Sequence, residues 1–147
     1  METVGNFIHG KTTLSSSGET LPVANPATGK VIRQVTQSTR EEMLAAIQSA
    51  HEAFPAWSKM TPLRRARILF EFKVLLEKHR DELAALIVSE HGKVWSDALG
   101  ELTRGIEVVE FACGIPHLSK GEYSFNVGSG VDSFSLMQPL GVVAGLT

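Results

Sequence analysis

Short apolar groups alternate with turn-forming residues in the first third of the chain. Val4, Phe7 and Ile8 form a small apolar patch, and residues 31–35 carry the next apolar group. The intervening motif N-P-A-T-G at 25–29 combines a proline, which presets φ, with a glycine that tolerates positive φ, as tight turns require. This pattern predicts a small β-hairpin or meander.

Apolar residues that recur every three to four positions predict three helices in the middle of the chain. At the start of the first helix, Thr39 and Glu42 have the T-x-x-E spacing of a capping box, which satisfies backbone N–H groups that have no partner within the helix. Pro55 is expected to end this helix, because proline has no N–H to continue the hydrogen-bond ladder.

The second helix is expected to begin after Thr61, with Pro62 at its first position and Gly92 as its C-terminal cap. A continuous helix of that extent is about 45 Å long at 1.5 Å per residue. The third helix is expected over residues 94–117, ended by Pro116 and followed by Gly121. Two glycines inside it suggest close backbone contact with a neighbour, and these are Gly100 and Gly105.

The period of the pattern changes from 3.6 to 2 beyond the third helix. Tyr123, Phe125 and Val127 alternate with polar residues up to a Gly-Ser-Gly turn at 128–130, and residues 131–137 are expected to be extended. This pattern predicts a β-hairpin. Because a two-stranded hairpin is only marginally stable alone, it needs a sheet from elsewhere, such as another subunit.

The last segment, residues 139–147, contains only apolar residues, glycine, one proline and a terminal threonine. The absence of alternation predicts a strand buried on both faces, as in a parallel α/β sheet. A parallel sheet cannot be made from one strand, so the pattern predicts the front part of a longer protein that ends at the first strand of an α/β domain.

Composition narrows the classes of function. The balance of 14 Lys and Arg against 16 Asp and Glu gives a formal net charge of −2, which argues against a nucleic-acid-binding protein because that function needs a concentrated basic field. One cysteine excludes an internal disulfide framework. The sequence contains no apolar run of about 20 residues and no secretory signal pattern. We therefore expect a cytoplasmic protein that binds no membrane.

Few residues carry chemistry of their own. Cys113 lies on the apolar face of the third helix beside Val109, where a cysteine is usually an inert packing residue. Cys113 and His117 are too few ligands for a zinc site, so no metal is expected. The Gly-Ser-Gly at 128–130 lacks the third glycine and the following helix of a phosphate-binding motif, so it is interpreted as a hairpin tip.

Arg104 lies on the polar face of the third helix, with Glu101 and Glu107 three residues away on either side. Two interpretations are open. In the first, Arg104 forms a helix-surface ion pair worth under about 1 kcal/mol. In the second, its guanidinium reaches into a cleft and binds a substrate carboxylate in fork geometry.

Five segments, in order, resemble the N-terminal region of the aldehyde dehydrogenase superfamily. They are V-A-N-P-A-T-G at 23–29, A-F-P-A-W at 53–57, P-L-R-R-A at 62–66, E-H-G-K at 90–93 and Q-P-L-G-V-V at 138–143. The E-H-G-K segment, together with residues 104–113, is most similar to the CoA-acylating methylmalonate-semialdehyde dehydrogenase branch of that superfamily.

The resemblance implies an α/β fold: the N-terminal part of the aldehyde dehydrogenase fold, with a small β-hairpin, three helices, an oligomerisation hairpin and the first strand of a Rossmann-like sheet. Residues 1–121 would be the N-terminal strands and helices of the cofactor-binding domain. Residues 122–138 would be the oligomerisation hairpin of a homodimer or homotetramer, and residues 139–147 the truncated first strand.

The resemblance also implies an activity, namely NAD-dependent oxidation of methylmalonate or malonate semialdehyde through a thioester that is passed to coenzyme A, giving propionyl-CoA or acetyl-CoA. Arg104 matches the position that holds the substrate carboxylate, and Thr147 falls where the family backbone borders NAD. The catalytic Cys, Glu and Asn of the family match no residue here, so the chain alone is expected to be inactive and to bind no cofactor. Two alternatives are a non-catalytic oligomerising helical module and an aldehyde dehydrogenase for an aldehyde without a carboxylate.

Overall fold

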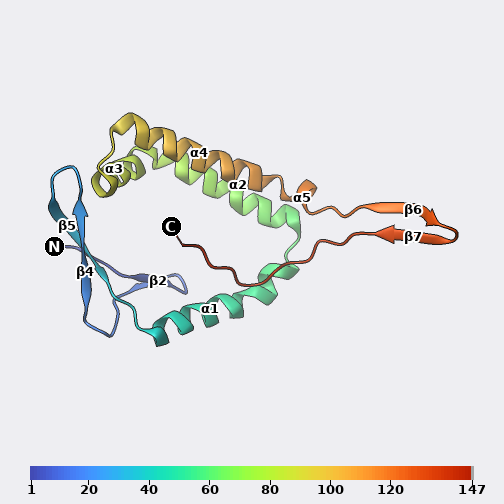
Figure 1. Ribbon diagram of the computed structural model, residues 1–147, viewed down its shortest axis with the longest axis horizontal. Helices are drawn as coiled ribbons and strands as arrows, with labels where there is room; N and C mark the ends of the chain where they lie inside the picture. Colours follow the sequence, from blue (N-terminus) through green and yellow to red (C-terminus); the bar gives the residue numbers. More distant parts are fainter. Residues whose placement is uncertain (147) are drawn as a thin grey trace.

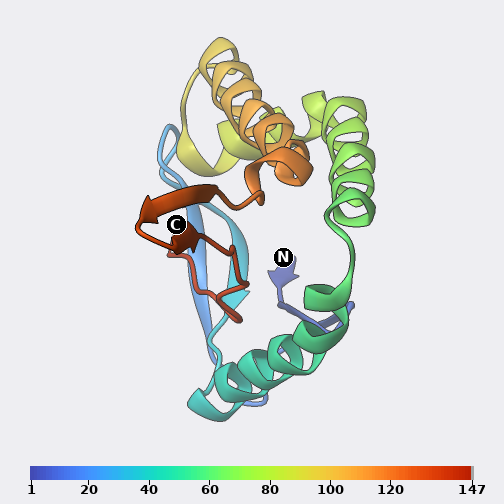
Figure 2. The same ribbon diagram turned by 90° about the vertical axis from the view of Figure 1, so that its right-hand side faces the viewer.

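The computed structural model describes residues 1–146, whose backbone follows an open frame (Figures 1 and 2). Three groups of elements form its sides: a β-hairpin, a long first helix, and a layer of further helices. A second hairpin projects from the frame at one end (Figure 1). The strands of the N-terminal part are β1 Thr3–Val4, β2 Asn6–Ile8, β3 Lys11–Thr13, β4 Thr20–Asn25 and β5 Lys30–Thr36.

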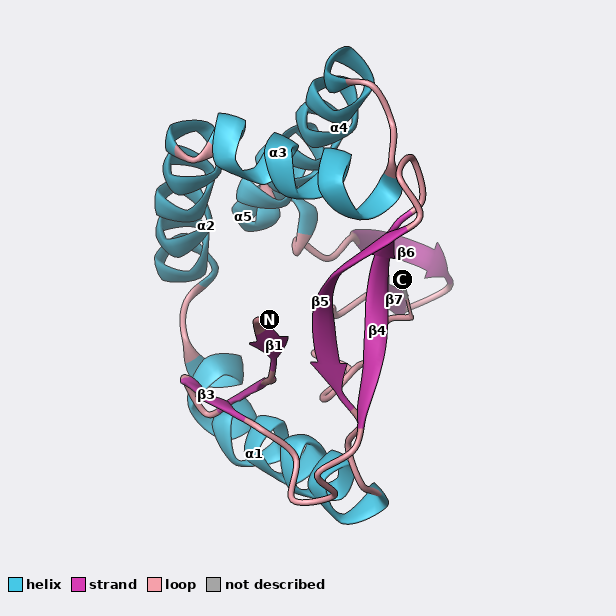
Figure 3. Cartoon of the chain, turned by 90° about the vertical axis from the view of Figure 1, so that its left-hand side faces the viewer, coloured by secondary structure: helices cyan, strands magenta, loops and turns pink. Residues whose placement is uncertain are grey.

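The predicted N-terminal hairpin is confirmed. β4 and β5 pair antiparallel and β1 adds to β5 in parallel, which gives the strand order β1-β5-β4, while β2 and β3 form a separate two-stranded ribbon. The turn uses the predicted residues: Gly29 has φ 66° and donates its N–H to the Asn25 carbonyl at 2.8 Å. Figure 3 shows this hairpin between helix α1, Arg40–Lys59, and helix α3, Arg80–His91.

Helix α1, Arg40–Lys59, begins as predicted but ends later. Both hydrogen bonds of the capping box are present, since Thr39 Oγ1 accepts from the Glu42 N–H at 3.2 Å and Glu42 Oε2 accepts from the Thr39 N–H at 3.0 Å. The prediction that Pro55 ends the helix is wrong. The φ that proline fixes is itself helical, so Pro55 removes one hydrogen bond and the helix continues for another turn, past Trp57.

The prediction of one continuous second helix is also wrong. The segment is divided at His79 into α2, Pro62–Lys78, and α3, Arg80–His91. His79 has φ −99° and ψ 19°, which are not helical. Next to this break, Arg80 Nη2 donates to Thr103 Oγ1 at 2.7 Å on the following helix, so α3 turns to pack on that helix. Gly92 ends α3 with φ 79°, as predicted.

The third predicted helix is α4, Trp95–Cys113, followed by the one-turn helix α5, Ile115–Leu118. It ends before residue 117 because Gly114, with ψ 4°, interrupts it. The middle of the chain therefore contains four longer helices and one short one, where three were predicted. The expected close neighbours of the helical glycines are absent from the described residues: a Cβ on Gly105 would meet nothing within 4 Å, and one on Gly100 would meet only Arg104 Nη1, at 3.7 Å.

The second predicted hairpin is confirmed as β6 Tyr123–Gly128 and β7 Val131–Phe134, with Gly130 in the turn at φ 75°. It projects away from the frame (Figure 1), and every residue in both strands is exposed. β7 is shorter than expected and stops at Phe134. The hairpin therefore makes no core of its own.

Residues 139–146 contain no strand, so the predicted first strand of a parallel sheet is not formed in the part of the chain that the structure describes. A strand needs a hydrogen-bonding neighbour, and no strand of residues 1–146 is paired with this segment. Leu140 and Leu146 are 94% and 103% exposed, whereas residues 141–143 line a cavity with Trp57 and other residues of α1, so other elements cover this segment only in part. Within residues 1–146, no helix combines the length and the apolar character needed to cross a membrane.

The core is small and the exposed surface is large. The buried apolar residues among those described are Ala66, Ala84, Ala98, Ile106 and Cys113. The accessible surface is 11269 Å², whereas a compact monomer of this mass exposes about 7,400 Å². Many apolar side chains on the frame thus lie open to contact with further protein surface.

Candidate functional site

Two of the sequence motifs meet next to the start of α4. Gly92, in the E-H-G-K segment, is so close to the N-P-A-T-G turn that a Cβ on it would lie 2.9 Å from Pro26 Cγ and 3.0 Å from the Ala27 nitrogen. Gly92 also has φ 79°, a conformation that glycine adopts without strain. The contact therefore depends on glycine for two reasons, and it fixes where the chain enters α4.

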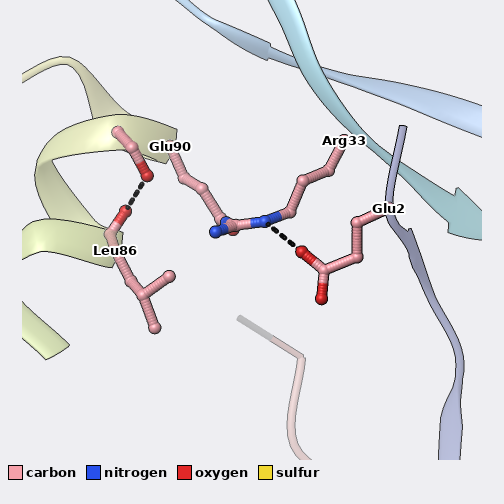
Figure 4. Close-up of polar contacts among 5 residues, drawn as sticks. Glu2, Arg33, Leu86 and Glu90 are labelled. Atoms are coloured by element: carbon pink, nitrogen blue, oxygen red, sulfur yellow. Dashed lines mark hydrogen bonds and ion pairs between the residues drawn. The ribbon is translucent and has the colours of Figure 1, made fainter. Parts of the chain in front are cut away.

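An ion-pair bridge holds the same corner together. Arg33 on β5 extends between the N-terminal strand and the end of α3 (Figure 4). Its Nη1 lies 2.6 Å from Glu90 Oε1, and its Nε lies 3.3 Å from Glu2 Oε2. Only 22% of the Arg33 side chain is exposed, so the bridge is partly shielded from solvent. Sequence analysis missed Arg33; its only signal is a cation at an interior position of the strand, between the apolar residues Ile32 and Val35.

Lys93 forms the next contact along the chain, with α4. Its Nζ lies 2.5 Å from Glu101 Oε2, and the two side chains are 18% and 48% exposed. The hydrogen bond and the charge of Lys93 lower the pKa of Glu101 below its usual value, with smaller contributions from His91 and Arg104. Lys93 therefore links the E-H-G-K segment to the first turns of α4.

Arg104 lies one turn further along α4 and is exposed. Its Nη1 lies 3.7 Å from the position that a Cβ on Gly100 would occupy, so the guanidinium is directed back toward the start of the helix. The acid on that side, Glu101, is bound by Lys93. Among the ion pairs of residues 1–146 none includes Arg104, so the surface ion pair that the sequence left open is not formed there.

The other candidate residues make no site with these. Thr147 lies outside the described residues. Cys113 is buried, 5% exposed, which confirms its interpretation as a packing residue, and it lines a shallow cavity with His117. In the described part of the chain, no three side chains of the metal-binding types lie close enough to hold a metal ion. The glycines at 128–130 form the tip of the β6–β7 hairpin, as predicted, and no helix follows them up to residue 146.

Comparison with known proteins identifies the family. The profile described as "Aldehyde dehydrogenase family" matches residues 13–147. The chain belongs to the aldehyde dehydrogenase family. The fold agrees, because the mixture of strands and helices described above matches the N-terminal part of solved aldehyde dehydrogenase structures.

Two relatives illustrate the similarity. Malonate-semialdehyde dehydrogenase 2 of Geobacillus thermodenitrificans is 50% identical over 146 residues, which are 99% of this chain and 30% of that protein. Malonate-semialdehyde dehydrogenase of Pseudomonas aeruginosa is 46% identical over 147 residues, or 100% of this chain and 29% of that protein. The chain thus spans about 30% of the length of these curated aldehyde dehydrogenases.

Two solved structures give the same result. Methylmalonate-semialdehyde dehydrogenase of Oceanimonas doudoroffii superimposes with a TM-score of 0.88 at 48% identity, covering 95% of this chain and 28% of that one. A Sinorhizobium meliloti protein complexed with NAD superimposes with a TM-score of 0.89 at 42% identity, covering 96% of this chain and 29% of that one.

Proposed function

We propose that this chain is the N-terminal portion of an NAD-dependent, CoA-acylating aldehyde dehydrogenase. Its substrates would be malonate or methylmalonate semialdehyde, which yield acetyl-CoA or propionyl-CoA. The proposal is supported by relatives that bear the name malonate-semialdehyde dehydrogenase. The observation that carries it is the exposed Arg104 guanidinium, which forms no ion pair within residues 1–146.

The role of Arg104 follows from the shape of the substrate. A semialdehyde has an aldehyde at one end and a carboxylate at the other. A guanidinium donates two parallel hydrogen bonds to a carboxylate and so fixes both its position and its plane. Arg104 would hold the carboxylate, and the short carbon chain would then set where the aldehyde carbon lies. Binding through a remote group in this way orients the reacting carbon.

NAD would accept the hydride and coenzyme A the acyl group when bound. The Gly-Ser-Gly at 128–130 lies in a hairpin tip and does not precede a helix that would bind the phosphates of NAD, so we assign none of residues 1–146 to the cofactor. Thr147 is the one residue that we propose to border NAD. We also propose that the catalytic Cys, Glu and Asn of the family are not among residues 1–147, and that these residues alone produce no NADH.

We further propose that the β6–β7 hairpin joins subunits of a homo-oligomer, either a dimer or a tetramer. Its aromatic side chains Tyr123, Phe125 and Phe134 are 64%, 79% and 76% exposed. Both of its outer edges carry backbone groups that are free to pair with another strand. Replacing Phe125 and Phe134 with Ser is expected to lower the oligomeric state of the full-length protein, measured by light scattering. An unchanged mass contradicts this role.

The substitution Arg104→Leu in the full-length protein tests the function. We expect KM for malonate semialdehyde to rise by about ten- to a hundredfold, as expected for the loss of a charge-assisted bidentate pair. KM for propanal, which has the same carbon chain but no carboxylate, should change little. Arg64→Leu removes an exposed arginine from α2 and serves as the control. If Arg104→Leu leaves KM for malonate semialdehyde unchanged, Arg104 does not bind the substrate carboxylate, and the proposed function is contradicted.

A non-catalytic assembly module is the second candidate, and the large exposed surface and the projecting hairpin favour it. Light scattering and denaturation of the 147-residue chain test it. A discrete oligomer with cooperative unfolding supports the module, whereas a polydisperse aggregate supports the enzyme portion.

A further inference from the structure

The residues around Arg104 form a short row of charges in which one acid lies between two cations. Lys93 precedes α4, and Glu101 and Arg104 lie on it three residues apart. Residues three apart on a helix are neighbours, so Glu101 is within reach of either cation. The structure shows that it pairs with Lys93, at 2.5 Å.

This choice of partner determines whether Arg104 can bind an anion. A guanidinium already paired with a carboxylate would have to give up that pair before it could bind a substrate carboxylate. Because Arg104 is directed back over Gly100, toward the start of the helix, Glu101 is the acid on its side, and Glu107 lies a turn away in the opposite direction. Without Lys93, nothing in this row would keep Glu101 from Arg104.

We infer that Lys93 is a positioning residue for substrate binding: it holds Glu101 away from Arg104 and thereby leaves the Arg104 guanidinium available to the carboxylate of the aldehyde substrate. The inference rests on the proposed role of Arg104. It assigns a function to the lysine of the E-H-G-K segment that does not require Lys93 to touch the substrate. It also assigns Glu101 the role of a competitor for Arg104.

The geometry favours a lasting pair between Lys93 and Glu101. The lysine side chain is 18% exposed, so its ammonium group is less free to move into solvent than that of an ordinary surface lysine. The loop that carries it is fixed at Gly92 by the contact with Pro26, and the end of α3 just before the loop is fixed at Glu90 by the bridge to Arg33. Two residues of the E-H-G-K segment, Glu90 and Gly92, are therefore held in place just before Lys93.

Four variants of the full-length protein test the inference. In Lys93→Met, Glu101 is released and pairs with Arg104, so we expect KM for malonate semialdehyde to rise by up to about fivefold, with kcat and KM for propanal little changed. In the double variant Lys93→Met with Glu101→Gln, the competitor is gone and KM should return to within about twofold of the original value. Lys93→Arg keeps a cation at this position and should retain the original KM.

Lys73→Met is the matched control. Lys73 is a lysine of similar exposure, 22%, and it pairs with Glu77 and Glu110 instead of Glu101. This variant should leave KM for malonate semialdehyde and KM for propanal unchanged.

Two kinetic results overturn the inference. If Lys93→Met leaves KM for malonate semialdehyde unchanged, Lys93 does not control Arg104. If the double variant stays as impaired as Lys93→Met, Lys93 acts by direct contact or through the fold, and not by holding Glu101.

A spectroscopic readout separates this inference from the proposed function. The Arg104 Nε–H resonance in a ¹H–¹⁵N spectrum should move in Lys93→Met and return in the double variant, because it reports the pairing of Glu101 with Arg104 without substrate. An unmoved resonance overturns the inference. If the resonance moves while Arg104→Leu leaves KM unchanged, the pairing exchange is real but the proposed function, and with it the role in substrate binding, is wrong.

Discussion

Arg33 Nη1 lies 2.6 Å from Glu90 Oε1, although the two residues are 57 positions apart in the sequence. The pair connects β5 to the last turn of α3 and thus fixes the strands of the N-terminal part against the helical layer. Glu90 is also the first residue of the E-H-G-K segment. Arg33 therefore helps to fix the position of the backbone from which Lys93 extends.

Removal of this bridge should destabilise the protein. We expect Arg33→Met to lower the free energy of unfolding by about 1 kcal/mol, the upper part of the range for partly exposed pairs, because two acids lose the same partner. Urea denaturation measures the effect. Glu2→Gln is the control, since Glu2 is 73% exposed and should contribute less. Equal stability of Arg33→Met and the original protein would show that the bridge has no net value.

The two threonine caps offer a matched comparison. Thr39 makes a side-chain hydrogen bond to the first turn of α1, whereas Thr61 occupies the same position before α2 and makes none. We expect Thr39→Ala to lower the free energy of unfolding by about 1 kcal/mol, and Thr61→Ala to change it by at most a few tenths. Thermal and urea denaturation of both variants test this. A larger effect at Thr61 would contradict the capping assignment.

Acid should destabilise the protein through Glu42. Hydrogen bonds from Ser15 Oγ, the Ser16 N–H and the Thr39 N–H to its carboxylate lower the pKa of Glu42 from 4.5 to about 2. A pKa that is lower in the folded state contributes stability that is complete above pH 4.5 and is lost as the pH falls toward 2.

Urea midpoints measured between pH 7 and pH 2 test this dependence. We expect Glu42→Gln to have a lower midpoint at pH 7 and a shallower decline below pH 4.5 than the original protein. Glu41→Gln replaces an exposed acid in the same turn and should keep the original decline. Identical slopes for Glu42→Gln and the original protein would rule out this origin of acid sensitivity.

Gly92→Ala should be more harmful than an alanine at another left-handed glycine. At Gly92 the added Cβ would meet Pro26 Cγ at 2.9 Å and the Ala27 nitrogen at 3.0 Å, whereas at Gly10, with φ 74°, it would meet nothing within 4 Å. We expect about 1 kcal/mol of backbone strain at Gly10 and roughly 2–3 kcal/mol at Gly92, where a close contact adds to the strain. Denaturation of both variants checks the difference, and equal losses would show that the motif contact can relax.

The features that the sequence predicts correctly are those whose causes lie within a few residues. The capping box needs only Thr39 and Glu42, and the turn at 25–29 needs only its own proline and glycine. The break at His79 lies within the polar run at 77–82, which interrupts the apolar series. The sequence still predicts one helix, because Leu76 and Leu83 on either side of this run are seven positions apart and would share one face of a continuous helix. One contact beside it, between Arg80 and Thr103, joins positions 23 apart.

The candidate site shows the same division. The helical pattern places Arg104 on a polar face, and the resemblance to a family gives it a role. Neither shows whether Glu101 pairs with Lys93 or with Arg104. That choice depends on Lys93, which precedes α4, and on the loop contacts that fix it. The apolar pattern of residues 139–146 predicted a strand, yet a strand also requires a partner, and the pattern says nothing about whether one lies nearby.

The β6–β7 hairpin closes at its base through two hydrogen bonds, from the Ser135 N–H to the Glu122 carbonyl at 2.9 Å and from the Glu122 N–H to Ser135 Oγ at 2.8 Å. Its two stems therefore leave the frame side by side. A short glycine linker spliced between residues 121 and 136 could replace the whole arm without pulling the frame apart. Exchanging this arm would therefore change the exposed surface that it presents while the corner around Arg104 stays intact.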